Sequence, residues 1–150
     1  MIEIVSPGVM ASVQDCGRTG ARNIGVGVSG AMDVMALHVG NLLVGNDPDL
    51  AGIEFTLGGF SVLFCHDSTF ALTGANMNVC LDGVPVPTWW VRRAKAGQIL
   101  TAGMATSGMR TMLTVSGGIT VPLVMGSRST DLKGGFGGHE GRLLQSGDRL

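Results

Sequence analysis

The spacing of the hydrophobic positions changes after about residue 50, and this change predicts the architecture. From residue 31 to residue 45, apolar side chains recur every three or four positions, which is typical of an amphipathic helix. The expected apolar stripe consists of Met32, Met35, Ala36, Val39, Leu42 and Leu43. Ser29 or Gly30 can cap the helix, and with Gly30 as the cap Asp33 occupies the third helical position, where a carboxylate is favoured.

Short apolar or alternating segments, separated by glycine and proline, make up most of the remaining chain. Strands are predicted at residues 2–5, 53–57, 60–64, 69–73, 77–81, 89–91, 98–101 and 109–115. Asp82-Gly83 lies between two apolar segments and predicts a two-residue hairpin turn. Trp89 and Trp90 are expected at the core and rim of the fold. Many short strands with closely spaced turns predict an antiparallel sandwich or barrel, so we expect a mainly β domain with one principal helix.

Composition excludes several classes of function. The chain of 150 residues has a net charge of −1 and only 14% charged residues, without the clustered lysine and arginine that nucleic acids or acidic membranes attract. Three cysteines without a C-x-x-C spacing make a disulfide framework or a structural zinc site unexpected, and they favour a reducing compartment. No signal peptide or membrane span is recognisable, so we expect a soluble cytoplasmic protein.

A polar loop before the predicted helix is the first candidate for ligand binding. Gln14, Asp15 and Arg18 lie within five residues, and an arginine can hold a carboxylate or phosphate through two hydrogen bonds. The alternative is an Asp15–Arg18 pair that stabilises only its own loop. The loop leads to the start of the helix, where unpaired backbone N–H groups and the helix dipole favour an anion.

Two glycine-containing segments suggest phosphate binding, but neither is convincing as a nucleotide site. Residues 25–30 match G-x-G-x-x-G, yet the buried strand that a dinucleotide site requires before this pattern is missing. In residues 126–130, three hydroxyl side chains surround Arg128, a set that suits an anion or, alternatively, a turn. This segment lacks the lysine and the spacing of a Walker A loop.

The cysteine and histidine residues do not predict a metal site. Cys16 has no histidine near it in the sequence, so we expect a small packing residue rather than a nucleophile. Cys65, His66 and Asp67 are adjacent, and adjacent strand residues point to opposite faces, so they are not expected to share one ion. His38 falls on the polar side of the predicted helix and is expected to be solvated.

Several segments together resemble the N-terminal half of the biotin-dependent carboxyltransferase-like proteins. They comprise residues 13–18, 25–26, 29–33, 41–46, 72–75, 116–119 and 126–130. The family is also called allophanate hydrolase subunit 2, and it includes the C-type subunit of 5-oxoprolinase and the Kip anti-inhibitor proteins. Its members are roughly twice as long as this chain. The resemblance therefore implies that residues 1–150 are the N-terminal part of a longer domain, truncated at the C-terminus and inactive alone.

The resemblance also implies a fold, partners and an activity. The expected fold is a cyclophilin-like β-barrel, paired in the cytoplasm with a homologous partner of the allophanate hydrolase subunit 1 type, which is the B-type subunit of 5-oxoprolinase. The first expected activity is ATP-dependent opening of 5-oxoproline to glutamate, which involves two partner subunits. One alternative is carboxyl transfer to urea or a similar amide from biotin on a separate carrier. The other is a non-catalytic partner of a kinase-inhibitor-like subunit.

The same resemblance assigns roles to the motif residues. Asp15 is expected to orient Arg18 or polarise the amide, while Arg18 and Arg128 stabilise an anionic oxygen. These three are the expected catalytic residues, and no metal is expected. The expected substrate-binding residues are Gln14, Ser29, Gly30, Asp33, Ser129 and Thr130. Ala21 and Met112 stand where family members often have an aromatic residue.

Overall fold

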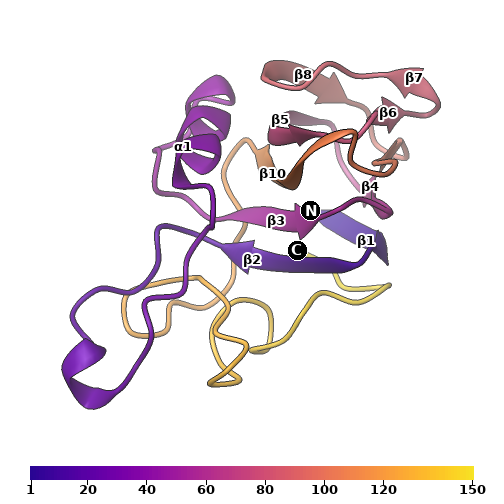
Figure 1. Cartoon of the computed structure of the whole chain (residues 1–150). Helices are drawn as coiled ribbons and strands as arrows, with labels where there is room; N and C mark the ends of the chain where they lie inside the picture. Colours follow the sequence, from indigo (N-terminus) through magenta and orange to yellow (C-terminus); the bar gives the residue numbers. More distant parts are fainter.

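The computed structural model describes residues 1–150 and consists of strands, one α-helix and a long irregular segment near the C-terminus (Figure 1). The elements are β1 (Ile2–Pro7), β2 (Met10–Gln14), the 3₁₀ helix η1 (Arg22–Ile24), α1 (Val34–Leu43), β3 (Gly52–Thr56), β4 (Phe60–Phe64), β5 (Ser68–Asn76), β6 (Cys80–Leu81), β7 (Val84–Pro85), β8 (Trp90–Ala94), β9 (Ile99–Thr101) and β10 (Ser107–Val115). The prediction of a mainly β protein with one principal helix is confirmed.

The strands form two antiparallel five-stranded sheets. Their orders are β1-β4-β9-β6-β7 and β2-β3-β10-β5-β8. Each sheet ends in a short or exposed strand, β7 or β8, and neither of these strands pairs back to the first strand of its sheet. The strand pairing therefore gives two open sheets, and the expected closed β-barrel is not found.

Turn chemistry explains where the sequence prediction succeeded and where it failed. Asp82 and Gly83 both have positive φ, at 48° and 80°, and join β6 to β7 as the predicted hairpin. The predicted strand 77–81 is reduced to β6 because Asn78 also has a positive φ and donates its N–H to the Asn76 side chain. Trp89 and Trp90 are exposed, contrary to their expected place in the core and rim, and Trp89 has a φ of 61° just before β8.

Aromatic and aliphatic side chains of both sheets form the main core. It contains 23 buried residues from β1–β5, β9, β10 and other segments of the chain. Phe55 and Phe60 stack with their ring centroids 4.4 Å apart, and the ring centroids of Phe64 and Phe70 are 5.1 Å apart. Burying each of these rings stabilises the fold by about 1.5–3 kcal/mol. This core fixes the positions of β5 and β10, the two strands that carry the helix.

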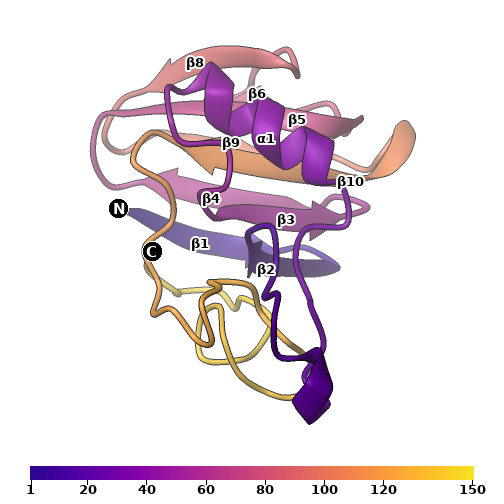
Figure 2. The same cartoon turned by 90° about the vertical axis from the view of Figure 1, so that its left-hand side faces the viewer.

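Helix α1 begins later than the sequence predicted and buries a different face. Asp33 is its N-cap and accepts a hydrogen bond from the Ala36 N–H at 2.9 Å, so it is not the third helical residue. The buried side chains of the helix are Ala36, Leu37, Gly40 and Asn41. Met32, Met35 and Leu42 of the expected stripe are exposed. Figure 2 shows α1 lying across β5 and β10, and small residues on its buried face permit this close approach.

Replacing Gly40 by alanine is expected to lower the free energy of unfolding by about 1–3 kcal/mol, because the helix must move away from the sheet. A Cβ atom at Gly40 would lie 2.9 Å from both Thr73 Oγ1 and Thr114 Oγ1. Thr73 cannot yield freely, since its hydroxyl donates to Ala36 O at 2.6 Å. Urea denaturation measures the change. The control Met35→Ala, on the exposed face, should change stability by less than about 0.5 kcal/mol.

The chain after β10 is mostly irregular and packs beside β1 and β2 (Figures 1 and 2). Thr130 donates its N–H to Val13 O, and Leu144 donates to Ala11 O. The last residue exchanges two backbone hydrogen bonds with Ile2 of β1. These contacts place residues 127–131 against the loop that follows β2. The structure contains no helix with the length and apolar character that a membrane crossing requires.

Candidate functional site

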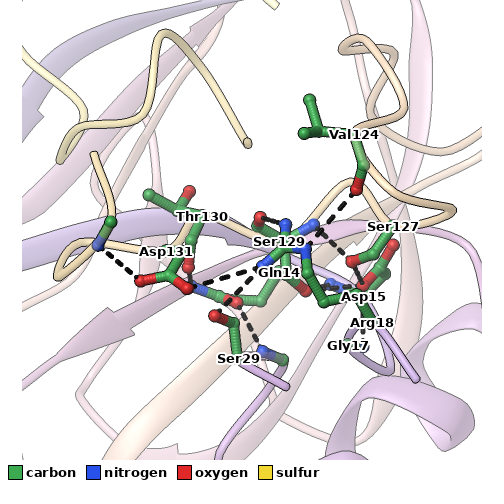
Figure 3. A network of polar contacts seen from close by, with 12 residues as sticks. Gln14, Asp15, Gly17, Arg18, Ser29, Val124, Ser127, Ser129, Thr130 and Asp131 are labelled. Atoms are coloured by element: carbon green, nitrogen blue, oxygen red, sulfur yellow. Dashed lines mark hydrogen bonds and ion pairs between the residues drawn. The ribbon is translucent and has the colours of Figure 1, made fainter. Parts of the chain in front are cut away.

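A largely buried polar cluster joins three segments that are distant in the sequence. Figure 3 shows side chains of the β2 end and its following loop, the segment before α1, and the 127–131 segment converging on one point. We call this set the polar cluster: Gln14, Asp15, Arg18, Ser29, Gly30, Ser127, Ser129 and Thr130. Most of the residues that the sequence predicted as a site are thus brought together. Their hydrogen bonds, however, run chiefly to one another.

Asp15 is the centre of the cluster and is saturated with donors. Its carboxylate accepts hydrogen bonds from the Gly17 N–H, the Arg128 N–H and the hydroxyls of Ser127 and Ser129. Its own N–H donates to Ser129 Oγ at 2.9 Å. No hydrogen bond or ion pair connects it to Arg18, so the expected orientation of Arg18 by Asp15 is wrong for this structure. A catalytic role of Asp15 stays a prediction.

The same contacts decide the ionisation of Asp15. Burial on its own would raise the pKa of this carboxyl group, which is only 8% exposed. The hydrogen bonds from Ser127 and Ser129 and from the N–H groups of Arg128 and Gly17 favour the charged form, and together they outweigh burial. The pKa of Asp15 is therefore lowered below its usual value of 3.8, and the group is a carboxylate at neutral pH.

Acid should weaken the fold through Asp15. Since its folded-state pKa is lowered, the ionised group contributes stability that is complete above its unfolded pKa of about 4 and is lost as the pH falls through the lower folded value. The variant Asp15→Asn should lose this part of the pH dependence and be less stable at pH 7. Urea denaturation at several pH values tests this. The exposed control Asp47→Asn should keep the wild-type pH profile; equal profiles for wild type and Asp15→Asn would contradict the prediction.

The Arg18 side chain connects three segments of the chain through hydrogen bonds. Its side chain is inaccessible to solvent and donates to Ser129 O, to Ser29 Oγ at 3.1 Å and to Val124 O at 3.4 Å. Its guanidinium lies 4.9 Å from the centre of the Phe136 ring, and Asp131 is 4.0 Å away. A group whose donors are used inside the protein cannot grip a ligand at the surface. The donors of Arg18 are thus used inside the protein, and its catalytic role stays a prediction.

Other predicted site residues make further hydrogen bonds between the segments around Arg18. Gln14 accepts from the Gly30 N–H at 3.2 Å and donates to Ser12 Oγ at 2.9 Å. Thr130 donates both its N–H and its hydroxyl to Val13 O. Half-buried Arg128 donates from Nε to Val121 O at 3.1 Å, and its catalytic role stays a prediction. The hydroxyl contacts of Ser127, Ser129 and Thr130 match the turn-stabilising alternative for residues 126–130.

The expected anion site at the start of α1 is filled by the protein's own carboxylates. Glu54 accepts hydrogen bonds from the Met32 N–H at 2.8 Å and the Asp33 N–H at 3.4 Å. Asp33 itself caps the Ala36 N–H. Residues 25–30 follow η1 rather than the buried strand that a dinucleotide site requires. The carboxylates of Asp33 and Glu54 therefore place negative charge at the helix start.

An open cavity lies beside this helix start and includes side chains that the sequence did not single out. It measures about 550 Å³, and Met32, Asp33, Asn76, Thr88, Trp89, Ser107, Met109 and Arg110 are among its lining residues. Of the predicted site residues, only Asp33 lines it. Arg110 pairs with buried Glu54 at 3.1 Å and keeps 27% of its side chain exposed. Sequence reasoning missed Arg110. The signal that could have identified this residue is its position as a single basic residue within the apolar strand β10.

The two positions where the family often has aromatics lie away from this cavity lining. Ala21 is half-buried just before η1. Met112 is buried with Ala36 and Leu37 under the helix. Neither contributes to the cavity beside Asp33 and Arg110. Their replacement therefore changes packing or surface shape rather than the lining of this cavity.

Cys16 has a histidine beside it after all. Its Sγ lies 3.1 Å from His38 Nε2 and 3.3 Å from Asp49 Oδ1, so His38 is not simply solvated. Burial, followed by the neighbouring Asp49 carboxylate, raises the pKa of the Cys16 thiol to about 12. A thiol with this pKa is protonated at neutral pH, and the prediction that Cys16 is not a nucleophile is unchanged.

Comparison with known proteins connects this chain and its fold to one family. The family model for the carboxyltransferase domain, subdomain A and B, matches residues 24–150. The chain is 52% identical over 150 residues to the C-type 5-oxoprolinase subunit of Escherichia coli K12, covering all of this chain and 48% of that protein. It is 43% identical over 150 residues to urea amidolyase of Saccharomyces cerevisiae, covering 99% of this chain and 8% of that protein.

A solved structure shows the same fold. The crystal structure of Kluyveromyces lactis urea carboxylase superimposes with a TM-score of 0.95 at 39% identity, over 98% of this chain and 13% of that chain. The chain spans about half the length of the C-type 5-oxoprolinase subunits from Escherichia coli and Haemophilus influenzae. The arrangement of the two sheets and the helix is thus that of a region within longer proteins.

Proposed function

Because the chain belongs to the carboxyltransferase domain, subdomain A and B family, we propose that it acts within a 5-oxoprolinase complex that opens 5-oxoproline to glutamate at the expense of ATP. The observation that carries this proposal is the identity along the whole chain to the C-type 5-oxoprolinase subunit of Escherichia coli. That protein is named as one subunit of an assembly, so the proposal includes partner subunits. The three free cysteines fit a cytoplasmic setting.

We assign binding of the lactam to the cavity beside α1. Its volume of about 550 Å³ is in the range of small-molecule sites. Arg110 offers a fixed cationic donor to an oxygen that gains negative charge as the amide is attacked. The half-exposed Trp89 ring provides a flat apolar surface for the planar lactam, and the Asn76 amide offers further hydrogen bonds.

The nucleotide is assigned to the partner subunits. Residues 25–30 follow a 3₁₀ helix, and their last residue donates to Gln14. Residues 127–130 wrap around the Asp15 carboxylate, and the Arg128 N–H points to that carboxylate rather than outward. These residues do not fit a phosphate cradle. ATP therefore binds elsewhere in the complex and activates the substrate from there. This chain binds and orients the amide.

The proposal is tested by glutamate formation from 5-oxoproline. The intact protein is mixed with its partner subunits, and glutamate is measured with ATP, without ATP and with each subunit omitted in turn. Release of glutamate that depends on ATP and on this protein is the expected result. Assembled, folded complex that hydrolyses no 5-oxoproline would overturn the proposal.

A second function, in which the cavity holds urea as the carboxyl acceptor, is favoured by the close superposition on urea carboxylase. Urea is also a planar amide, so Trp89 and Arg110 would serve it in the same way. The biotin would arrive on a separate carrier, and no residue of this chain is assigned to it. Carboxylation of urea by the intact protein with a carboxybiotin carrier, in the absence of 5-oxoproline hydrolysis, would identify this reaction.

A further inference from the structure

Three potential metal-ligating atoms converge beside α1, at residues that do not line the cavity. Cys16 comes from the loop after β2, His38 from the middle of α1, and Asp49 from the turn that follows the helix. The Cys16 Sγ lies 3.1 Å from His38 Nε2 and 3.3 Å from Asp49 Oδ1. His38 Nε2 and Asp49 Oδ1 are 3.2 Å apart. The three atoms therefore form a nearly equilateral triangle.

This geometry differs from that of a nucleophile with its base. In such a relay, histidine contacts the nucleophile through one ring nitrogen and the orienting carboxylate through the other. Here the thiol and the carboxylate both contact the same atom, His38 Nε2. Asp49 Oδ1 is likewise next to both of the other atoms, so the three do not form a linear relay. Three ligand atoms at these mutual distances instead match the arrangement of ligands around an ion.

We propose that Cys16, His38 and Asp49 form a three-ligand site for a divalent cation of the zinc class, with water as the fourth ligand. Zinc–nitrogen and zinc–oxygen bonds of about 2.0 Å and a zinc–sulfur bond of about 2.3 Å place tetrahedral ligands about 3.3–3.5 Å apart. The observed separations of 3.1 Å, 3.2 Å and 3.3 Å need only a small outward movement. A thiolate with an imidazole selects zinc over calcium or magnesium, which prefer oxygen ligands.

The surroundings suit a cation. The carboxylates of Asp15 and Asp47 add negative potential at the Cys16 sulfur. The side chain of Asp49 is 72% exposed and that of His38 is 39% exposed, so an ion can reach the site and a water ligand has room. A bound ion would link the loop that carries Asp15 to the helix α1. The site is independent of the proposed function, and the spacing of its three residues along the chain did not predict it.

Cobalt and zinc binding by the intact protein test this proposal. After dialysis against a chelator, addition of Co²⁺ to wild type should produce a thiolate-to-cobalt charge-transfer band and visible d–d bands of a tetrahedral site, with one ion bound per chain. Zn²⁺ should remove these bands. Competition with a chromophoric chelator then gives the zinc affinity of wild type, Cys16→Ser, His38→Ala and Asp49→Asn.

Each of the three variants should bind zinc at least about tenfold more weakly, since loss of even an outer-shell partner costs that much. The matched control Cys65→Ser removes another half-buried free thiol, next to His66, and should bind zinc like wild type. Asp49 lies at the surface, so Asp49→Asn keeps the test valid if another variant unfolds. Absence of the charge-transfer band in wild type, or equal zinc affinity in wild type and Cys16→Ser, would overturn the proposal.

Discussion

Replacing Arg18 by alanine is expected to lower the free energy of unfolding by about 3–5 kcal/mol, the range found when one member of a buried charged contact is removed. The change leaves Ser129 O, Ser29 Oγ and Val124 O without their donor and opens a cavity against Phe136. Urea denaturation of the intact protein measures the loss. Arg18→Lys should recover only part of the stability, because an ammonium group cannot reach all three acceptors of the guanidinium.

The control for Arg18 is Arg22→Ala, an exposed arginine of η1, which should change stability by less than about 0.5 kcal/mol. A second measurement, of glutamate formation, distinguishes a structural role of Arg18 from a catalytic one. If Arg18→Ala kept wild-type stability but lost glutamate formation, the arginine would contact the substrate and the structural role assigned here would be wrong. A loss of stability, with activity recovered at temperatures where the variant is folded, is the expected pattern.

Replacing Arg110 by methionine is expected to lower kcat/KM for 5-oxoproline by about 10²–10³-fold, the loss that follows removal of one donor to a developing anion. The methionine side chain fills much of the same space, but it offers neither charge nor hydrogen bonds. Steady-state glutamate formation by the assembled complex measures the change. Most of it should appear in kcat, because the contact strengthens as the amide oxygen becomes negative.

Two variants distinguish this role from a purely structural one. Arg110→Lys keeps the charge but not the planar donor set, so it should retain intermediate activity. Arg149→Ala removes an exposed arginine that pairs with Glu3, and it should retain the wild-type kcat/KM. Wild-type kinetics in Arg110→Met would exclude the cavity beside α1 as the site of chemistry, while leaving the family assignment unaffected.

Local chemistry explains which elements could be predicted from the sequence. Asp82 and Gly83 adopt positive φ at little cost, so their hairpin formed where it was expected. Apolar runs bounded by glycine located β3, β4 and β10 to within two residues at either end. Family membership also followed from short motifs spread along the chain. The helix start was misplaced because Asp33 can cap or occupy the first turn, and its bond to Ala36 decides between them.

Residue order alone was enough to specify a mainly β chain with one helix, its turns, its family and the gathering of polar residues around Gln14–Arg18. The partners of those polar groups depended on the packing of distant segments. Residues 127–131 pack against β2 and give Asp15 the donors that Arg18 was expected to provide, and Arg18 is buried there. Packing of α1 likewise brought Cys16 to His38 and Asp49, which are 22 and 33 residues away. Spacing along a chain limits local geometry, whereas contacts between distant segments depend on the whole core.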